Sequence, residues 1–237
     1  MKKQLLLILV TGIMNTLIYG QNQTEVPVID RSIFFGNPEI SGGQLSPDGK
    51  FISFLKEFKG TMNIWVKKFD EPFANAKRLT NLERPSAGYF WTYDGKYILY
   101  ANDKGGNENF NIFAVSPSAS IDASTGIPEN RNLTPMDSVT AYIYMVSKKD
   151  PNKLMIGLNN RDQRWHDLYQ LEINTGKLTL LNENKDRLSS WIFDWNENPR
   201  MAIRNPEDGS TELLSLDGGA PRKIYSVTAL EGVNPLA

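Results

Sequence analysis

The sequence predicts an all-β fold, a partial β-propeller of about four blades, each a four-stranded antiparallel sheet. Residues Ser46–Phe54 recur in near copy as Thr92–Tyr100. Each copy is followed by a second strand-like run and then by a Leu-Thr pair, Leu79-Thr80 and Leu133-Thr134. An internal period of about 40–50 residues made of short strands is typical of propeller blades. No helical periodicity of any length follows the first twenty residues, which also favours an all-β chain.

The first twenty residues have the pattern of a secretory signal peptide. Lys2 and Lys3 form a positive start, Leu5–Val10 begins an apolar stretch, and the small Gly20 stands before a polar run. The apolar stretch is shorter and more interrupted than a membrane-spanning helix requires. We expect an exported protein, periplasmic or extracellular, with no membrane attachment after cleavage. An uncleaved N-terminal anchor is the alternative.

Composition excludes several partners. The formal charge is −1, and removing residues 1–20, which contain two lysines and no acid, changes it to −3. Such a mild charge gives no reason to expect a nucleic-acid partner. The chain has no cysteine, so its stability rests on packing and sheet hydrogen bonds. About 215 residues are enough to bury a sizeable core. No motif implies a cofactor.

The elements follow in order after a polar segment at residues 21–38. Dense β-branched and aromatic residues bounded by turn residues indicate the strands. Asp48-Gly49 and Asp94-Gly95 are hairpin signals, because glycine tolerates the positive φ of tight turns. In the third blade Asp150–Lys153 stands where the Asp-Gly-Lys turn stood, and residues 116–130 look like an insertion. The expected blades within the propeller region 39–237 are 40–82, 88–133, 140–182 and 190–226, with the start of a fifth at 227–237.

Four motifs give the chain a family resemblance. Phe35–Pro38, Leu45–Lys50, Asp103–Asn109 and Arg164–Tyr169 resemble the N-terminal propeller of the prolyl oligopeptidase (S9) family of serine peptidases, in its acylaminoacyl-peptidase and dipeptidyl-peptidase-like branch. The resemblance covers nearly all of residues 33–230. It implies a propeller that restricts peptide access to a C-terminal α/β-hydrolase domain.

The catalytic half of that family is not visible in this sequence. A hydrolase domain would carry Gly-x-Ser-x-Gly on a strand-to-helix turn, and this chain has no such motif. We therefore expect no catalytic residue, no peptide hydrolysis by the chain alone, and a sequence that is part of a longer protein. The alternative is a stand-alone TolB-like or WD40-like binding propeller. A glycosidase propeller, which needs two positioned carboxylates, has no motif in its favour.

Four residues are candidates for contact with a substrate or partner: Glu108, Asn109, Arg164 and His166. Glu108 and Asn109 lie in a polar loop that could reach a peptide amine, whereas a plain hairpin loop is the simpler interpretation. His166 is the only histidine. Its neighbour Asp167 should point to the opposite face of the strand, so the pair is poorly placed for a catalytic triad.

Other residues favour structural roles. A metal site is not expected, since no second histidine or any cysteine is available. Arginines 161, 164 and 187 suit a substrate carboxylate, but salt bridges are the simpler interpretation. The tryptophans are expected to pack between blades, with carbohydrate stacking as the alternative: Trp65, Trp91, Trp165, Trp191 and Trp195.

Overall fold

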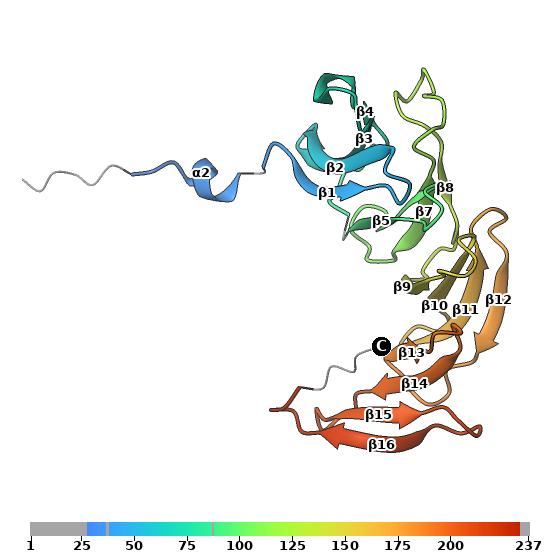
Figure 1. Ribbon diagram of the computed structural model, residues 1–237. Coiled ribbons are helices and arrows are strands. Elements are labelled where there is room, and N and C mark those ends of the chain that lie inside the picture. Colours follow the sequence, from blue (N-terminus) through green and yellow to red (C-terminus); the bar gives the residue numbers. More distant parts are fainter. Residues whose placement is uncertain (1–27, 37, 87, 233–237) are drawn as a thin grey trace, which may run out of the picture. The chain divides into compact units, whose positions relative to one another are not determined.

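The computed structural model describes residues 28–36, 38–86 and 88–232, which fall into two units, 1–37 and 38–237. The described part of the first unit is one short helix, α2 (Arg31–Phe35) (Figure 1). The Asp30 carboxylate accepts a hydrogen bond from the Ser32 amide at 2.8 Å and caps this helix. The sequence did not predict it, because five residues are too few to show a helical period. The expected signal peptide lies outside the described residues.

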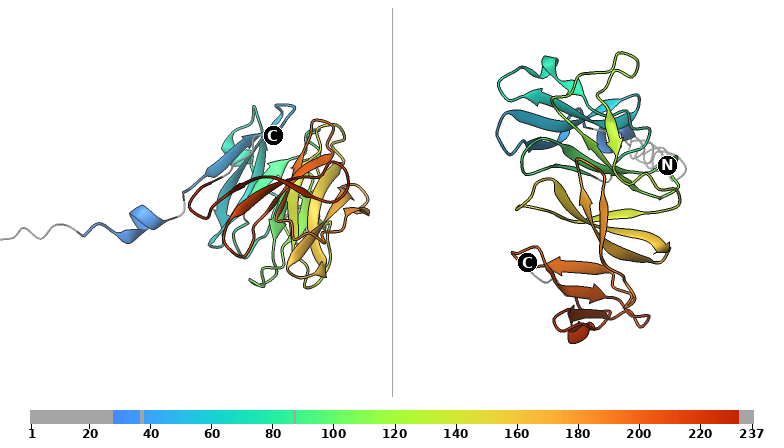
Figure 2. Two further views of the ribbon diagram at one scale, coloured as in Figure 1. Left: turned by 90° about the horizontal axis from the view of Figure 1, so that it is seen from below. Right: turned by 90° about the vertical axis from the view of Figure 1, so that its right-hand side faces the viewer.

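The second unit consists of four four-stranded antiparallel sheets, each built from consecutive strands in chain order (Figures 1 and 2). This confirms the predicted fold class, and we call the sheets blades 1 to 4. Blades 1 and 2 contain β1 (Ser41–Leu45), β2 (Phe51–Phe58), β3 (Thr61–Lys68), β4 (Lys77–Arg78), β5 (Tyr89–Trp91), β6 (Ile98–Asn102), β7 (Asn111–Val115) and β8 (Asn130–Asn132). Blades 3 and 4 contain β9 (Ala141–Val146), β10 (Lys153–Asp162), β11 (Trp165–Glu172), β12 (Leu178–Asn182), β13 (Ser190–Phe193), β14 (Pro199–Arg204), β15 (Thr211–Ser215) and β16 (Arg222–Val227). A 3-10 turn, η1 (Phe73–Asn75), precedes β4.

Hydrophobic cores lie between successive blades. One cluster joins blades 1 and 2, a second joins blades 2 and 3, and a third joins blades 3 and 4. Strand β10 shows how one sequence serves two cores: Leu154, Ile156 and Leu158 belong to the second cluster, whereas Met155 belongs to the third. Side chains alternate between the faces of a strand, so a central strand packed on both faces is a continuous apolar run.

The turn between the first two strands of a blade repeats its chemistry as well as its sequence. The Asp48 carboxylate accepts hydrogen bonds from the Ser46 hydroxyl at 2.8 Å and the Lys50 amide at 3.1 Å. These bonds, with the Lys50 ammonium, lower the Asp48 pKa to about 2. Asp94 accepts the same bonds from Thr92 and Lys96. The Asp-Gly-Lys motif therefore forms a self-closing turn.

In each of the first two blades, the Leu-Thr pair directly follows the fourth strand and bonds the third strand. The Thr80 hydroxyl accepts a hydrogen bond from the Ile64 amide, and the Thr134 hydroxyl accepts one from the Ile112 amide, both at 2.9 Å. Both threonines are buried. These amides have no ladder partner at that point, so the hydroxyl satisfies a buried donor.

Replacing Thr134 with valine is expected to reduce the free energy of unfolding by about 1–2 kcal/mol, because valine keeps the volume but leaves the Ile112 amide without an acceptor. Urea unfolding followed by tryptophan fluorescence measures this. Thr134→Ser, which keeps the hydroxyl, is the control. No loss in Thr134→Val, or a clearly larger loss in Thr134→Ser, would show that the methyl group, not the hydrogen bond, matters.

The blades present two faces, defined here by their loops. The turn face carries the connections between first and second strands, such as residues 46–50 and 92–97. The hairpin face carries the connections between second and third strands, such as residues 103–110. Each blade has four antiparallel strands, so its first strand begins and its fourth strand ends at the hairpin face. No hydrogen bond among residues 38–86 and 88–232 joins blade 1 to blade 4.

Two details differ from the sequence-based expectation. Val227, expected to open a fifth blade, is the last residue of β16. The fifth blade stays a prediction, since residues 233–237 lie outside the described part. Trp195, expected to pack between blades, is 85% exposed. In the described part of the chain, no helix is long and apolar enough to cross a membrane.

Candidate functional site

A polar cleft of about 510 Å³ opens beside the β6–β7 loop on the hairpin face. Amide and carboxylate side chains dominate its wall, and the Oδ1 atom of Asn102 is buried there without a hydrogen-bond partner. Asp103 is nearly buried and lies 3.8 Å from the Arg84 guanidinium. An unpaired buried acceptor is costly, so this cleft suits a ligand that donates hydrogen bonds. The other asparagines in its wall are Asn81, Asn107, Asn109, Asn111 and Asn132.

An apolar pocket of about 400 Å³ lies on the other side of the same loop. It is formed at the junction of blades 2 and 3, where β5 and β9 begin. Phe110 from the loop and Tyr142 from β9 line it, and Tyr142 is half exposed. The remaining wall is Gly88, Tyr89, Phe90, Ala101, Ala141 and Ile143. A donor-binding cleft and an apolar pocket therefore flank one loop.

The structure places Glu108 and Asn109 in this loop, where Asn109 lines the polar cleft and Glu108 lines neither hollow. The Glu108 amide donates to the Asp103 carboxylate at 3.0 Å, and its carbonyl accepts from the Thr140 hydroxyl at 3.1 Å. Glu108 has a φ of 60°, a left-handed conformation uncommon outside glycine. Its backbone is thus held from both sides. Its carboxylate has no hydrogen bond or ion pair among the described residues.

His166 lies one blade further, at the start of β11, and stacks on Tyr142 with 4.5 Å between ring centroids. Its Nε2 atom is buried without a partner. Burial of the ring lowers the His166 pKa. The Asp167 carboxylate turns away to Arg161, as strand alternation requires. His166 therefore supports the pocket wall through Tyr142 as a neutral ring.

Folding is expected to weaken as pH falls below about 6.5, the ordinary pKa of imidazole. Burial holds the folded-state pKa of His166 lower, so the unfolded chain binds the proton more readily. The stability is complete above the ordinary pKa and is lost as pH falls toward the folded-state pKa. Urea unfolding from about pH 8 to pH 5 measures this slope. A His166→Phe variant, which keeps the stack on Tyr142, should show a smaller slope; an unchanged slope would contradict this prediction.

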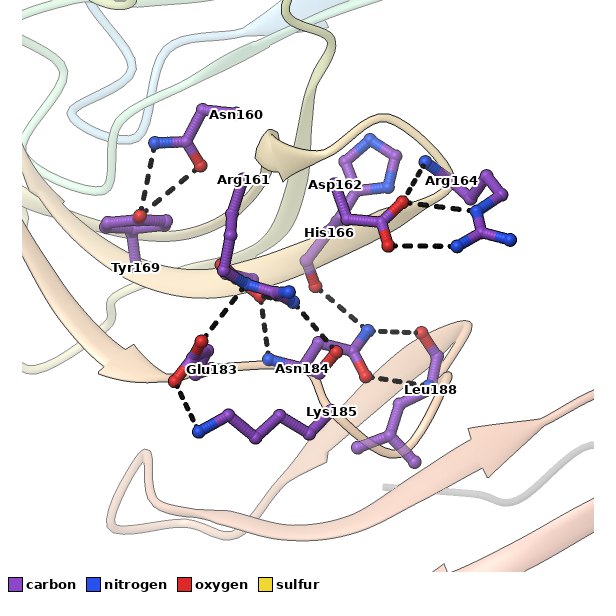
Figure 3. Close-up of polar contacts among 11 residues, drawn as sticks. Asn160, Arg161, Asp162, Arg164, His166, Tyr169, Glu183, Asn184, Lys185 and Leu188 are labelled. Atoms are coloured by element: carbon purple, nitrogen blue, oxygen red, sulfur yellow. Dashed lines mark hydrogen bonds and ion pairs between the residues drawn. The ribbon is translucent and has the colours of Figure 1, made fainter.

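Arg161 and Asp167 form the most connected polar cluster of blade 3 (Figure 3). The guanidinium donates to both oxygens of the Asp167 carboxylate at 2.8 Å, and the backbone amide of Asn184 donates to the same carboxylate at 2.7 Å. The side-chain amide of Asn184 donates to the carbonyls of His166 and Leu188, and its oxygen accepts a hydrogen bond from the Leu188 backbone amide. The fork of Arg161 is thus occupied by a carboxylate of its own blade.

Arg164 stands apart from the other three candidates. It lies at the tip of the β10–β11 hairpin, where its exposed guanidinium pairs with Asp162 at 3.2 Å. On the hairpin face, the structure places Asn109 in the wall of the polar cleft and His166 against Tyr142 of the apolar pocket, whereas Glu108 and Arg164 line neither hollow. The sequence did not mark Asn102 or Tyr142 as site residues. For Asn102, its position directly before the polar loop was the one available signal, and Tyr142 had none. No group of metal-binding side chains is found among the described residues.

Four blades with cores between them and a site on the hairpin face define a β-propeller domain. The chain is similar to dipeptidyl aminopeptidase BIII of Pseudoxanthomonas mexicana, 36% identical over 188 residues, which is 79% of this chain and 26% of that protein. It is also similar to dipeptidyl peptidase family member 6 of Caenorhabditis elegans, 25% identical over 78% of this chain and 24% of that protein. These relatives confirm the predicted resemblance to prolyl-oligopeptidase-type peptidases. No protein-family model matches the chain.

Solved structures agree on the fold. Prolyl oligopeptidase B from Galerina marginata superposes with a TM-score of 0.53 at 12% identity, covering 79% of this chain and 26% of that one. Oligopeptidase B from Leishmania major gives 0.50 at 12% identity, covering 79% and 26%. The chain thus spans about a quarter of the length of the curated relatives and of these structures.

Proposed function

We propose that this chain is the N-terminal propeller part of an exported prolyl-oligopeptidase-type serine peptidase, and that it gates peptide access to a linked C-terminal hydrolase domain. The match to a dipeptidyl aminopeptidase over 79% of the chain supports the family part of this proposal. The chain itself is then non-catalytic. His166 is its only histidine, and the neighbouring carboxylate is bound to Arg161 rather than to the imidazole.

The gating proposal rests on one observation. The candidate site opens at the same face at which the first strand of each blade begins and the fourth strand ends. Each blade begins and ends at the hairpin face. A domain that continues from the last blade is therefore attached at this face, where the polar cleft and the apolar pocket open. A peptide that reaches the hydrolase domain would pass the loop that carries Glu108 and Asn109.

The chemistry of the two hollows suits a peptide. Peptide amides and amines donate hydrogen bonds, which the Asn102 oxygen and neighbouring carboxamides accept. An apolar side chain of the same peptide fits the pocket against Phe110 and Tyr142. Ligand sites commonly combine an apolar wall with a few fixed polar groups.

The first test compares the 237-residue chain with the product of the same reading frame extended downstream. The extended protein is expected to release p-nitroaniline from dipeptidyl p-nitroanilides, and the 237-residue chain is expected to release none. A stop codon directly after Ala237 would contradict the proposal and favour a stand-alone binding propeller.

The second test addresses the gate in the extended protein. Replacing residues 104–107 with a Gly-Gly link should increase cleavage of large unfolded substrates relative to dipeptidyl substrates, because the loop narrows the passage. The matched control is the same link in place of residues 118–121, four residues of the β7–β8 connection on the turn face. Equal changes in both variants would argue against a gate at the hairpin face.

A further inference from the structure

A third hollow, on the turn face, is unrelated to the proposed passage. It has a volume of about 670 Å³ and lies between the turns of blades 3 and 4, with Tyr93 of blade 2 at its edge. We call it the aromatic groove. Apolar side chains line much of it, with Met145, Ile192 and Met201 among them. Methionine side chains adapt to the shape of an inserted group.

The propeller repeat explains why aromatic rings gather here. Pro47, Tyr93, Lys148 and Trp195 occupy the same position in the first turn of blades 1 to 4, the residue after the Ser, Thr, Ser or Asp that begins the turn. Lys148 lies 5.8 Å from the centre of the Tyr93 ring and 5.9 Å from that of Trp195. Its ammonium therefore joins the two rings into one surface.

The groove is rigidly supported although its aromatic wall is open to solvent. The Glu197 carboxylate accepts hydrogen bonds from the Ser147 hydroxyl at 2.7 Å and from the Lys148 amide at 2.9 Å. It also accepts one from the Lys149 amide at 3.1 Å. These bonds lock the turn of blade 3 to that of blade 4. Trp195 is nevertheless 85% exposed and Tyr93 46% exposed, which is unusual for large rings beside an apolar hollow.

The charges at the rim are unequally compensated. Arg200 is paired with Asp217 at 3.0 Å and with Asp194 at 3.9 Å, and Glu197 is bound to turn amides. Among the described residues, Lys148 and Lys149 have no carboxylate partner; Lys149 donates to the neutral Asn196 side chain at 2.8 Å. Two lysines that form no ion pair among the described residues therefore flank an apolar hollow whose wall also holds the Asp194 and Glu197 carboxylates.

We propose that the aromatic groove binds a protein segment that inserts an apolar side chain and presents carboxylates to Lys148 and Lys149. The hollow supplies the anchor pocket and the lysines supply charge complementarity. Its concave form favours an inserted side chain over a flat lipid surface. This proposal is independent of the gate, because the turn face lies at the opposite end of the strands from the hairpin face.

The test is a titration of the full 237-residue chain with fluorescein-labelled, end-blocked peptides, followed by fluorescence anisotropy. The probe has a central Leu-Phe pair flanked by aspartates, and the comparison peptide has lysines in place of the aspartates. The aspartate peptide is expected to bind at least tenfold tighter, and Trp195→Ala should weaken it about tenfold, as loss of an anchoring aromatic does. Lys148→Glu should change the preference, so that the affinity for the lysine peptide approaches or exceeds the affinity for the aspartate peptide.

Two matched variants act as controls. Tyr225→Ala removes an exposed ring from the outer strand β16, and Lys177→Glu makes the same charge change on the turn face outside the groove. Neither should alter the affinity by more than about twofold. Equal binding of both peptides, or binding unaffected by Trp195→Ala, would overturn the proposal. So would tight binding to phosphatidylglycerol vesicles with none to the aspartate peptide, since that would assign the surface to a membrane.

Discussion

Replacing Asp167 with alanine is expected to reduce the free energy of unfolding by about 3 kcal/mol, the largest effect of any single polar substitution in blade 3. The Asp167 side chain is 2% exposed and accepts two hydrogen bonds from Arg161 and one from the Asn184 amide. Alanine leaves the buried backbone amide of Asn184 without an acceptor, and Arg161 keeps only the Asn184 carbonyl and Glu183. Removing one member of a buried network costs more than the network contributes, because the remaining groups stay desolvated.

Urea unfolding measures this loss, and two variants separate its parts. Asp167→Asn keeps an acceptor for the Asn184 amide but removes the charge, so it should lose less than alanine. Arg161→Gln leaves the buried Asp167 carboxylate without its cation, so it should lose more than Asp167→Asn, which leaves only the partly exposed guanidinium unpaired. If Arg161→Gln were milder than Asp167→Asn, the Asn184 bond rather than the ion pair would dominate. If Asp167→Ala were neutral, the cluster would not hold blade 3 to the chain that leads into blade 4.

Replacing Ile156 with alanine is expected to cost about 3–4 kcal/mol. Ile156 is completely buried at the centre of the cluster between blades 2 and 3. Truncation removes apolar area from the core and leaves a cavity. Neighbouring strands cannot collapse into it, because β10 is hydrogen-bonded on both sides, to β9 and β11. The same urea titration measures the loss.

Ile156→Val is the matched control, with an expected loss of about 1 kcal/mol. The two variants also test whether the blades unfold together. If tryptophan fluorescence and far-ultraviolet circular dichroism report the same midpoint in Ile156→Ala, the unit unfolds as one. Separate midpoints would show that loss of this core uncouples blades 1 and 2 from blades 3 and 4.

Much of the fold could be predicted because each repeat carries its own local chemistry. The turns at Asp48 and Asp94 close on themselves through side-chain bonds to residues two positions away. Thr80 and Thr134 bond amides 16 and 22 residues earlier, within their own blade, which explains why the Leu-Thr pair recurs. Both kinds of contact stay inside one repeat and therefore leave a sequence pattern. The boundary at Val227 was misjudged, because strand ends depend on pairing with β15 rather than on composition.

The candidate site was predicted only in part. The Asp103–Asn109 loop was found because polar residues cluster in the sequence. Asn102 and Tyr142 could not be found, because one is an ordinary strand residue and the other becomes important only through its stack on His166. Arg161 was a candidate for binding a carboxylate, and the structure gives it one from Asp167, six residues along the chain.

The sequence by itself determined the propeller architecture, the family resemblance and the absence of the serine motif, since these follow from repeated or contiguous residues. Only the tertiary structure decided that His166 is a half-buried ring against Tyr142, that Trp195 faces solvent rather than a blade interface, and that Lys148 lies between two rings from different blades. The physical reason is common to all three. Burial and contact across blades depend on how sheets pack, and no local stretch of the chain encodes which of its side chains a neighbouring blade will cover.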